Sequence, residues 1–221
     1  LPSYYYNDPT QWVTPPGSTE PINPNAILAG QEFLNNSQIN WNAMYIANQN
    51  LDTEGQAAYL LSEQRNDDNT ITANMLLSSI VSANMTFNAG VNFRNVKSHN
   101  YAVATDLLGA EYVLNVDSFF QGDNAQFDLN NPNQQVGKNG TFGYNYNLFA
   151  NVIDGFTQFK FNYKKFDFYL AQTFSRTEYQ REGLYRSGNY ANNSYGKGDS
   201  KVFENFGFKG GLTYKVTGQH Y

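Results

Sequence analysis

Few side chains in this sequence have the types and spacing that catalysis requires. Ser98 and His99, followed by Asp106, are the residue types of a serine-hydrolase triad. A triad, however, needs a nucleophile and a base that a third group orients on a rigid scaffold, and we expect this segment to be a flexible loop. The other histidine, His220, has no partner for a metal pair. We therefore predict no catalytic residues and no enzymatic activity.

Aspartates are the second chemical feature of the chain. Calcium takes six to eight oxygen ligands, and carboxylates are among those it prefers. The polar stretch after residue 97 holds four candidates: Asp106, Asp117, Asp123 and Asp128. Their spacing is not that of an EF-hand loop. We predict no metal site and no cofactor, and calcium binding by these loop aspartates stays open as the weaker alternative.

Aromatic and cationic residues occur together in the C-terminal third of the chain. This combination suits peptide or sugar ligands. The candidate ligand-binding residues are Tyr179, Arg181, Tyr185, Arg186 and Lys197. The simpler structural interpretation is an Arg181–Glu182 pair that stiffens the base of a loop.

Composition excludes several classes of protein. The net charge of −5 and the pI near 5.0 argue against a nucleic-acid partner, because phosphate binding needs clustered Lys and Arg. The mean hydropathy is −0.59 and no apolar run is long enough for a membrane helix. The chain has no cysteine, so disulfides and thiolate chemistry are also excluded. Aromatic residues make up 16% and charged residues only 15%, below the roughly 25% charged residues of ordinary soluble domains.

The elements that position the candidate residues are predicted to be long strands. From Asn84 to Arg94 every odd position is apolar and every even position is polar or glycine, which is the pattern of a strand with one apolar face. Its length, about eleven residues, matches a tilted strand that crosses a bilayer, whereas soluble strands are mostly about five or six residues long. The pattern favours a membrane β-barrel.

The same alternation recurs along the chain and predicts five crossings. We expect them at roughly 71–81, 85–95, 156–163, 166–176 and 203–216. Short turns at Ser82–Asn84, Lys164–Lys165 and Thr217–Gly218 alternate with long polar segments, as in outer-membrane barrels with short periplasmic turns and long extracellular loops. To keep this alternation, the strand-like stretch Phe142–Asn151 must be the arm of a raised extracellular hairpin.

This organisation divides the chain into six parts of one all-β domain, an antiparallel sector of an up-and-down transmembrane barrel. They are an extracellular loop region at 1–69, a hairpin at 70–96, a long extracellular loop at 97–155, a hairpin at 156–176, an extracellular loop at 177–201, and a strand with the start of the next one at 202–221. Within the first part, Ala26–Phe33 and Ile39–Asn48 are expected to form short helices.

In a barrel the alternating faces have opposite surroundings. The residues expected to face lipid are Met85, Phe87, Val91, Phe93, Phe159, Phe161, Phe206, Phe208 and Leu212. The polar partners expected to line the lumen are Thr86, Asn88, Asn92, Lys160 and Asn162. In the main alternative, a secreted β-sandwich, the first group would instead form an internal core.

Both ends of the sequence lead us to expect a piece of a longer chain. The first residues have neither the positive nor the apolar region of a signal peptide, and residues 215–221 look like a turn followed by an opening strand. Five crossings are also too few to close a barrel, because bacterial single-chain barrels have even counts of at least about eight.

Several loose motifs resemble the barrel region of TonB-dependent outer-membrane receptors, in the branch with an N-terminal carboxypeptidase-regulatory-like domain. They are Leu1-Pro-Ser-Tyr-Tyr, Gln38-Ile-Asn-Trp41, Asp106-Leu-Leu-Gly-Ala-Glu-Tyr112, Tyr144-Asn-Tyr146, Tyr179-Gln-Arg-Glu-Gly-Leu-Tyr185, Gly196-Lys-Gly198 and Lys209-Gly-Gly-Leu-Thr-Tyr-Lys215. The resemblance covers nearly the whole chain. It implies a sector of a 22-stranded barrel whose lumen a separate plug fills.

The resemblance also implies a function: a segment of a transporter that binds a ligand and imports it across the outer membrane of a Gram-negative bacterium. Its implied partners are outer-membrane lipid, an imported ligand of unknown identity, and the TonB energy-coupling complex, which would contact regions outside this sequence. The alternative function is that of a secreted binding module, either an adhesin or a carbohydrate-binding domain.

Overall fold

The computed structural model describes residues 38–216, and the predicted helix at Ala26–Phe33, the turn at Thr217–Gly218 and His220 lie outside this range. The chain divides into two compact units, 1–46 and 47–221. Within the described residues, the α-helix α3 runs from Trp41 to Gln49, and Asn40 caps its start by accepting a hydrogen bond from Ala43 N at 3.0 Å. The helix predicted around Ile39–Asn48 is confirmed.

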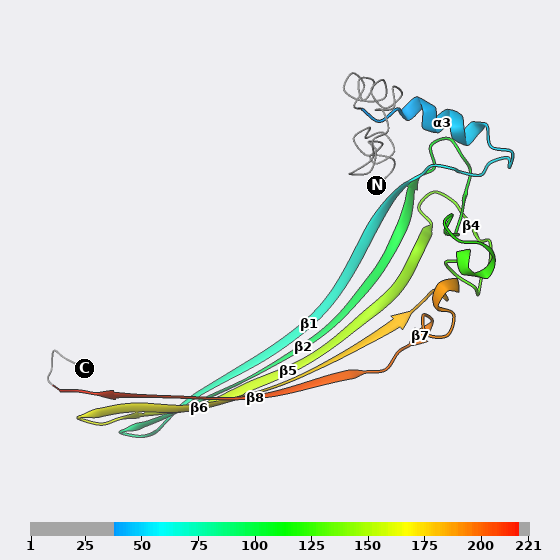
Figure 1. Ribbon diagram of the computed structural model, residues 1–221. Helices are drawn as coiled ribbons and strands as arrows, with labels where there is room; N and C mark the ends of the chain where they lie inside the picture. Colours follow the sequence, from blue (N-terminus) through cyan, green and yellow to red (C-terminus); the bar gives the residue numbers. More distant parts are fainter. Residues whose placement is uncertain (1–37, 217–221) are drawn as a thin grey trace, which may run out of the picture. The chain divides into compact units, whose positions relative to one another are not determined.

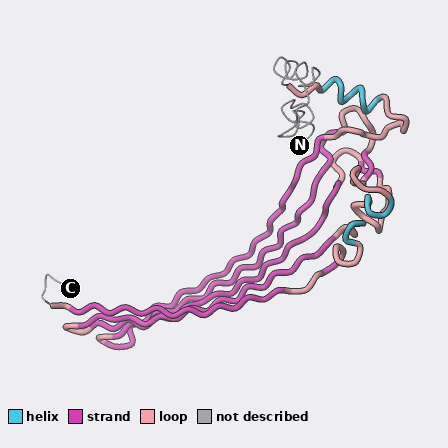
Figure 2. The backbone as a smooth tube through the Cα atoms, viewed as in Figure 1, coloured by secondary structure: helices cyan, strands magenta, loops and turns pink. Residues whose placement is uncertain are grey.

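Five long antiparallel strands make up most of the second unit, so the all-β antiparallel fold is confirmed (Figure 1). Their bounds are Leu61–Ser82 for β1, Met85–Asp106 for β2, Thr141–Asn162 for β5, Phe166–Gly183 for β6 and Lys201–Tyr214 for β8. Each long strand pairs with the next in the order β1, β2, β5, β6, β8. This is a simple up-and-down meander (Figure 2).

Connections of two very different lengths separate these strands. Residues 83–84 and 163–165 are tight turns, whereas 107–140 and 184–200 are long. The first long connection contains β3 (Val113–Leu114), the 3₁₀ helix η2 (Gly122–Ala125) and β4 (Gln135–Val136), and the second contains η3 (Gly188–Tyr190) and β7 (Gly196–Lys197). The predicted alternation of short and long connections is confirmed for these four.

The turn-side ends of the strands agree with the prediction to within one residue, and β8 agrees to within two at each end. The predicted loop-side ends of the other four strands were wrong, because these strands extend well into the expected loops. β1 already begins at Leu61, β2 continues to Asp106, and β6 continues to Gly183. Phe142–Asn151 is not the arm of a separate hairpin but the first half of β5, which pairs continuously with β2 and β6. Asp154 and Gly155 do not interrupt this strand, since Asn92 Nδ2 donates to Asp154 Oδ2 at 2.8 Å across the ladder.

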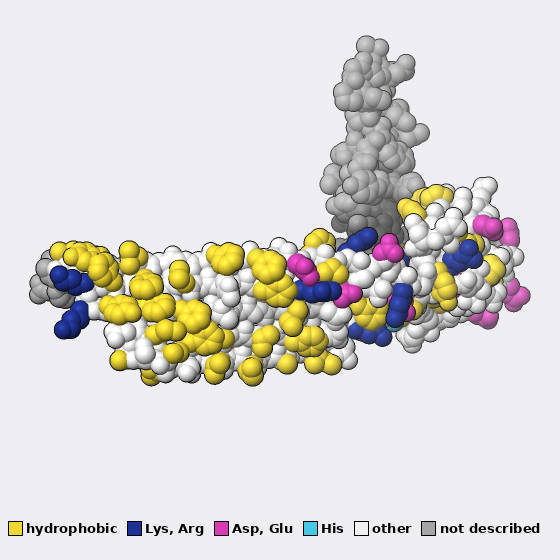
Figure 3. Space-filling view, turned by 90° about the horizontal axis from the view of Figure 1, so that it is seen from below, with side chains coloured by type: hydrophobic (Ala, Val, Ile, Leu, Met, Phe, Trp, Pro, Cys, Tyr) yellow, Lys and Arg dark blue, Asp and Glu magenta, His cyan; other side chains and the backbone are white. Residues whose placement is uncertain are grey.

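The antiparallel register gathers most of the large apolar side chains of the five strands on one side of the sheet, hereafter the apolar face. Directly opposite residues share a face, so Met75, Val91, Gly155, Phe174 and Phe206 form one continuous row. The nine residues predicted to share a face all belong to this side. Figure 3 shows hydrophobic side chains gathered over a broad area of the sheet.

The other side of the sheet, hereafter the polar face, carries rows of amide and hydroxyl groups. In one row Asn88 accepts from Ser78 Oγ at 2.8 Å and donates to Gln158 Oε1 at 3.4 Å. The five residues predicted to oppose the apolar set, Thr86, Asn88, Asn92, Lys160 and Asn162, all occupy even positions that alternate with it. Their placement on the opposite side is confirmed.

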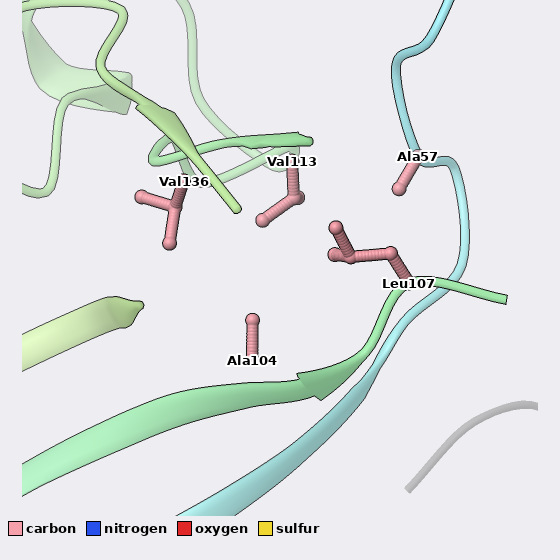
Figure 4. Packing of buried hydrophobic residues seen from close by; sticks show 5 residues of the cluster. All are labelled: Ala57, Ala104, Leu107, Val113 and Val136. Carbon is pink, nitrogen blue, oxygen red and sulfur yellow. The ribbon is translucent and has the colours of Figure 1, made fainter. Parts of the chain in front are cut away.

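The buried core is small and lies at the loop end of the sheet (Figure 4). Its packed cluster consists of Ala57, Ala104, Leu107, Val113 and Val136. Nearby, the buried Asn48 amide accepts from Ala58 N and Tyr59 N and donates to Leu107 O, at 2.8 to 2.9 Å. Large apolar residues in the middle of the strands are exposed instead, with Phe206 at 72% and Phe208 at 80%. No helix in the described residues is long and apolar enough to span a membrane.

Candidate ligand-binding site

A groove of about 400 Å³ lies where β5, β6 and the start of β8 run side by side. Its side chains come from two neighbouring rows of the polar face: Ala150, Tyr179 and Lys201 stand opposite one another, and Leu148 stands opposite Arg181. Asp199, just before β8, completes the polar-face lining. Phe149 and Gln180 also border the groove, although their positions alternate with these rows and belong to the other face. We call this set the β5–β8 groove.

Arg181 is the best-fixed cation of the groove. Its Cζ lies 4.9 Å from the centre of the Tyr146 ring, and its Nη1 donates to Ser194 O at 3.0 Å. The cation–π contact and the hydrogen bond hold the guanidinium plane from two directions. Neither Tyr146 nor Ser194 lines the groove, so the guanidinium lies at its loop-side edge. A guanidinium has five N–H donors, so donors remain there for a ligand.

Lys201 is the second cation, and its ion pair is weak. Its Nζ lies 3.9 Å from Asp199 Oδ2, and the two side chains are 70% and 92% exposed. Exposed pairs at this separation contribute little to stability because water screens them and their side chains lose entropy on pairing. The ammonium group is therefore available to another anion.

Tyr179 supplies an aromatic wall to the groove. It is 51% exposed, and its ring meets that of Phe203 edge to face, with the centroids 6.2 Å apart. Such contacts orient an aromatic ring while leaving part of its surface free for a ligand.

The other three predicted ligand-binding residues lie elsewhere. Tyr185 is half-buried and its hydroxyl donates to Thr141 O at 3.1 Å, while burial raises the pKa of its phenol. Arg186 donates from Nε to Ala191 O at 2.9 Å, within its own loop. Lys197, on β7, pairs with Glu182, a position that alternates with Arg181 and therefore faces the other side of the sheet. Thus only Tyr179 and Arg181 share the groove.

Asp128 links the two long loops. It is 2% exposed, and its carboxylate accepts hydrogen bonds from Asn130 N at 3.1 Å, Asn131 Nδ2 at 2.8 Å and Arg186 N at 3.0 Å. The backbone adds a hydrogen bond of 2.7 Å from Leu129 N to Arg186 O. The second loop, which leads into the groove, is therefore tied to the first.

The remaining loop aspartates act mainly in local turns. Asp117 Oδ1 accepts from Phe119 N at 3.0 Å, and Asp106 Oδ1 accepts from Leu108 N at 2.8 Å. That bond, more than the Lys138 ammonium 3.5 Å away, holds the pKa of Asp106 below its usual value. In residues 38–216 no three acidic or histidine side chains come close enough to hold a metal ion.

Ser98, His99 and Asp106, the residue types of a catalytic triad, do not come together in the structure. Ser98 and His99 are neighbours on β2, so their side chains leave opposite faces. His99 Nε2 lies 2.7 Å from Asn145 Oδ1, and its ring stacks on Tyr101. Asp106 is engaged at the strand end by Leu108 N. Neither contact joins His99 to Ser98 or to Asp106.

Sequence reasoning missed Leu148, Ala150, Asp199 and Lys201 as groove residues. Leu148 was assigned to the raised hairpin, although its alternation with Tyr146 was visible and would have placed it on the same face. Lys201 reaches the groove only because β8 pairs with β6. Compared with known proteins, the chain matches no family model and no curated protein.

Proposed function

We propose that this chain forms part of a transmembrane β-barrel in a TonB-dependent receptor of a Gram-negative outer membrane. In this proposal the apolar face contacts lipid and the polar face contacts the lumen. The long connections are extracellular and help to capture a ligand, which the whole receptor then imports.

The observation that carries the proposal is the distribution of charge across the sheet. On the apolar face, the described strand residues include no Asp, Glu, Lys or Arg over five segments: Met75–Ser82, Met85–Val91, Gly155–Phe161, Phe166–Phe174 and Phe206–Tyr214. At the same level the polar face carries Lys160, Asp167 and Lys209. In a membrane barrel the face that contacts lipid excludes charged residues, whereas the face toward the lumen can carry them.

The dimensions of this band agree with a bilayer. From Phe166 to Phe174 a strand advances about 26 Å, which a barrel tilt of about 40° converts to a height of roughly 20 Å, near the ~25 Å apolar band of outer-membrane barrels. The loop-side boundary carries the ion pair between Arg176 and Glu204, 3.3 Å apart. Aromatic rings meet at the turn end, where the centroids of Phe166 and Tyr214 are 5.0 Å apart.

The open edges of the sheet also support a larger barrel. Within residues 38–216 the outer edge of β1 has no partner strand, and β8 pairs only with β6. Unpaired strand edges cannot remain in hydrocarbon, because their backbone N–H and C=O groups would lack hydrogen bonds. Further strands would complete the ladder on both sides.

The assignment to the TonB-dependent class rests on the sequence motifs quoted above. It implies a plug and contact with the TonB energy-coupling complex through other parts of the receptor. The ligand-capture role rests on the β5–β8 groove, which lies at the loop end where incoming molecules would first meet the barrel.

Site-directed labelling tests the orientation of the sheet, and the lack of native cysteine makes single-cysteine variants simple to interpret. Phe206→Cys and Leu170→Cys are placed on the apolar face, and Asn205→Cys and Ala171→Cys are their controls on the polar face. Each is labelled with a bimane fluorophore in bilayers that contain nitroxide lipids. We expect strong quenching only for the first pair.

Equal quenching of both pairs would contradict the barrel orientation. A β-rich monomer in plain buffer, with labels at positions 170 and 206 shielded from lipid and water alike, would instead support a secreted β-sandwich whose second sheet covers the apolar face.

A further inference from the structure

We propose that the β5–β8 groove binds a carboxylate that is attached to an aliphatic or aromatic body. This inference names the ligand chemistry of the site and rests on the ligand-capture role proposed above. It follows from three properties of the groove: an apolar lining, an excess of positive charge, and a fixed guanidinium with free donors.

The apolar part of the lining sets the shape of the ligand's body. Leu148 is 42% exposed and Tyr179 is 51% exposed, so both present apolar surface rather than burying it against the sheet. Ala150 stands opposite Tyr179 and leaves room beside the ring because its side chain is a single methyl group. A volume of about 400 Å³ lies within the usual range for small-molecule sites.

The charge of the groove selects the ligand's polar end. Arg181 and Lys201 contribute two positive charges and Asp199 one negative charge, which leaves the groove at +1 on a chain whose net charge is −5. The 3.9 Å pair between Lys201 and Asp199 is exposed, so an incoming anion replaces it at little cost.

The guanidinium geometry favours a carboxylate in particular. Nη1 of Arg181 is occupied by Ser194 O, and the remaining N–H groups form the planar fork that pairs with two carboxylate oxygens. The ring of Tyr146, 4.9 Å away, keeps that plane in place.

Two sources share this chemistry, the C-terminus of a short peptide and a fatty acid. The test uses the whole receptor in detergent and saturation-transfer NMR titrations with three probes: N-acetyl-leucyl-leucine, its C-terminal amide, and octanoate. We expect the peptide acid to bind at least about five times more tightly than its amide. Binding of octanoate as tight as that of the peptide acid identifies a general carboxylate site, and weaker octanoate binding identifies a peptide site.

Charge variants assign the binding to this groove. Lys201→Gln is expected to weaken binding of the peptide acid about five-fold, and Asp199→Asn is expected to strengthen it about two-fold. Lys209→Gln is the matched control, because it removes the same charge from the same strand and the same face outside the groove. We expect it to leave the affinity unchanged.

Equal affinity for the peptide acid and its amide, or equal losses in Lys201→Gln and Lys209→Gln, would overturn the inference. Neither result bears on membrane insertion, which the lipid-quenching experiment reads independently. The two experiments therefore distinguish an error in the ligand inference from an error in the barrel orientation.

Discussion

Gly90 on β2 lies directly opposite Phe156 on β5, and a Cβ atom on residue 90 would come within 2.5 Å of Phe156 Cε1. Leu76, across from Gly90 on β1, places its Cδ2 2.7 Å from the same point. The three residues form an apolar contact on the polar face, in which the missing side chain of Gly90 makes room for the ring. The β1–β2–β5 ladder therefore depends on a glycine at position 90.

Replacing Gly90 by valine should destabilise the sheet by about 1 kcal/mol, because the Phe156 ring must move to admit the added methyl groups, whereas the exposed Leu76 side chain can turn away. Urea unfolding in detergent measures this change. Gly210→Ala is the control, since the nearest atoms to its Cβ would lie at 3.4 Å, and it should be nearly neutral. Phe156→Leu should recover part of the loss in the Gly90→Val background; additive effects of the two substitutions would refute the steric explanation.

Asp128 should control the joining of the two long loops. Asp128→Ala leaves Arg186 N and Asn130 N without their acceptor, and the loss of such buried bonds should reduce the local stability of the loops by about 2 to 3 kcal/mol. Hydrogen–deuterium exchange should accelerate in 107–140 and 184–200 while the strands remain protected. Asp128→Asn, which keeps one acceptor oxygen, is expected to give exchange rates between those of the unchanged chain and Asp128→Ala. Unchanged exchange in both loops would show that the backbone contacts suffice.

The stability of the first loop should depend on pH through Asp106. Its pKa is lower in the folded chain than in the unfolded chain, mainly because its carboxylate accepts from Leu108 N. The stabilisation is therefore present above the unfolded pKa of about 3.9 and is lost as the pH falls through the folded value. Amide exchange near Leu108, corrected for intrinsic rates, should be faster at pH 3 than at pH 7. Asp106→Asn should abolish that difference. If Asp106→Asn keeps the same pH dependence of exchange, Asp106 is not the source of that dependence.

A charge introduced on the apolar face should block folding into a bilayer, whereas the same charge on the adjacent residue should be tolerated. Phe206→Arg places a guanidinium in the uncharged band, at an expected cost of about 2 to 4 kcal/mol near the bilayer midplane. Asn205→Arg points to the polar face and should change little. The fraction folded into lipid vesicles, read from heat-dependent gel mobility, measures both. Equal folding of the two variants would argue against lipid contact.

Much of the fold was predictable because a strand's side chains alternate whatever its neighbours are. The period of two at Met85–Phe93 determined that these side chains share one face, and the antiparallel ladder kept them together with Phe159 and Phe206. The contrast between tight turns and long connections was likewise visible in the chain. These features depend on neighbouring residues in the sequence, so they could be predicted from the sequence alone.

The loop-side ends of β1, β2 and β6 were not predictable, because beyond the apolar band these three strands lose the alternation of apolar and polar residues. In β5 the alternation continues through Tyr144, Tyr146 and Leu148, and the error there was to assign this stretch to a separate hairpin. Asn147 pairs with Glu182 through a 3.0 Å hydrogen bond, and His99 contacts Asn145 at 2.7 Å, yet His99 and Glu182 lie in segments where the sequence pattern predicted loops. What extends the strands there is hydrogen bonding to a neighbouring strand. That partner is distant in sequence, so single-sequence patterns predicted loops.

The candidate site shows the same division between sequence and tertiary structure. The sequence by itself selected Tyr179 and Arg181 as candidate ligand-binding residues from their chemical types, but it assigned them to a loop. They share one face only because β6 continues to Gly183, since residues separated by one lie on the same face of a strand. Only the tertiary structure brought Lys201 opposite Tyr179 and sent Lys197 to the other face. The register between strands depends on turns, loops and packing along the whole ladder, and a groove made from three strands therefore exists only once those strands have paired.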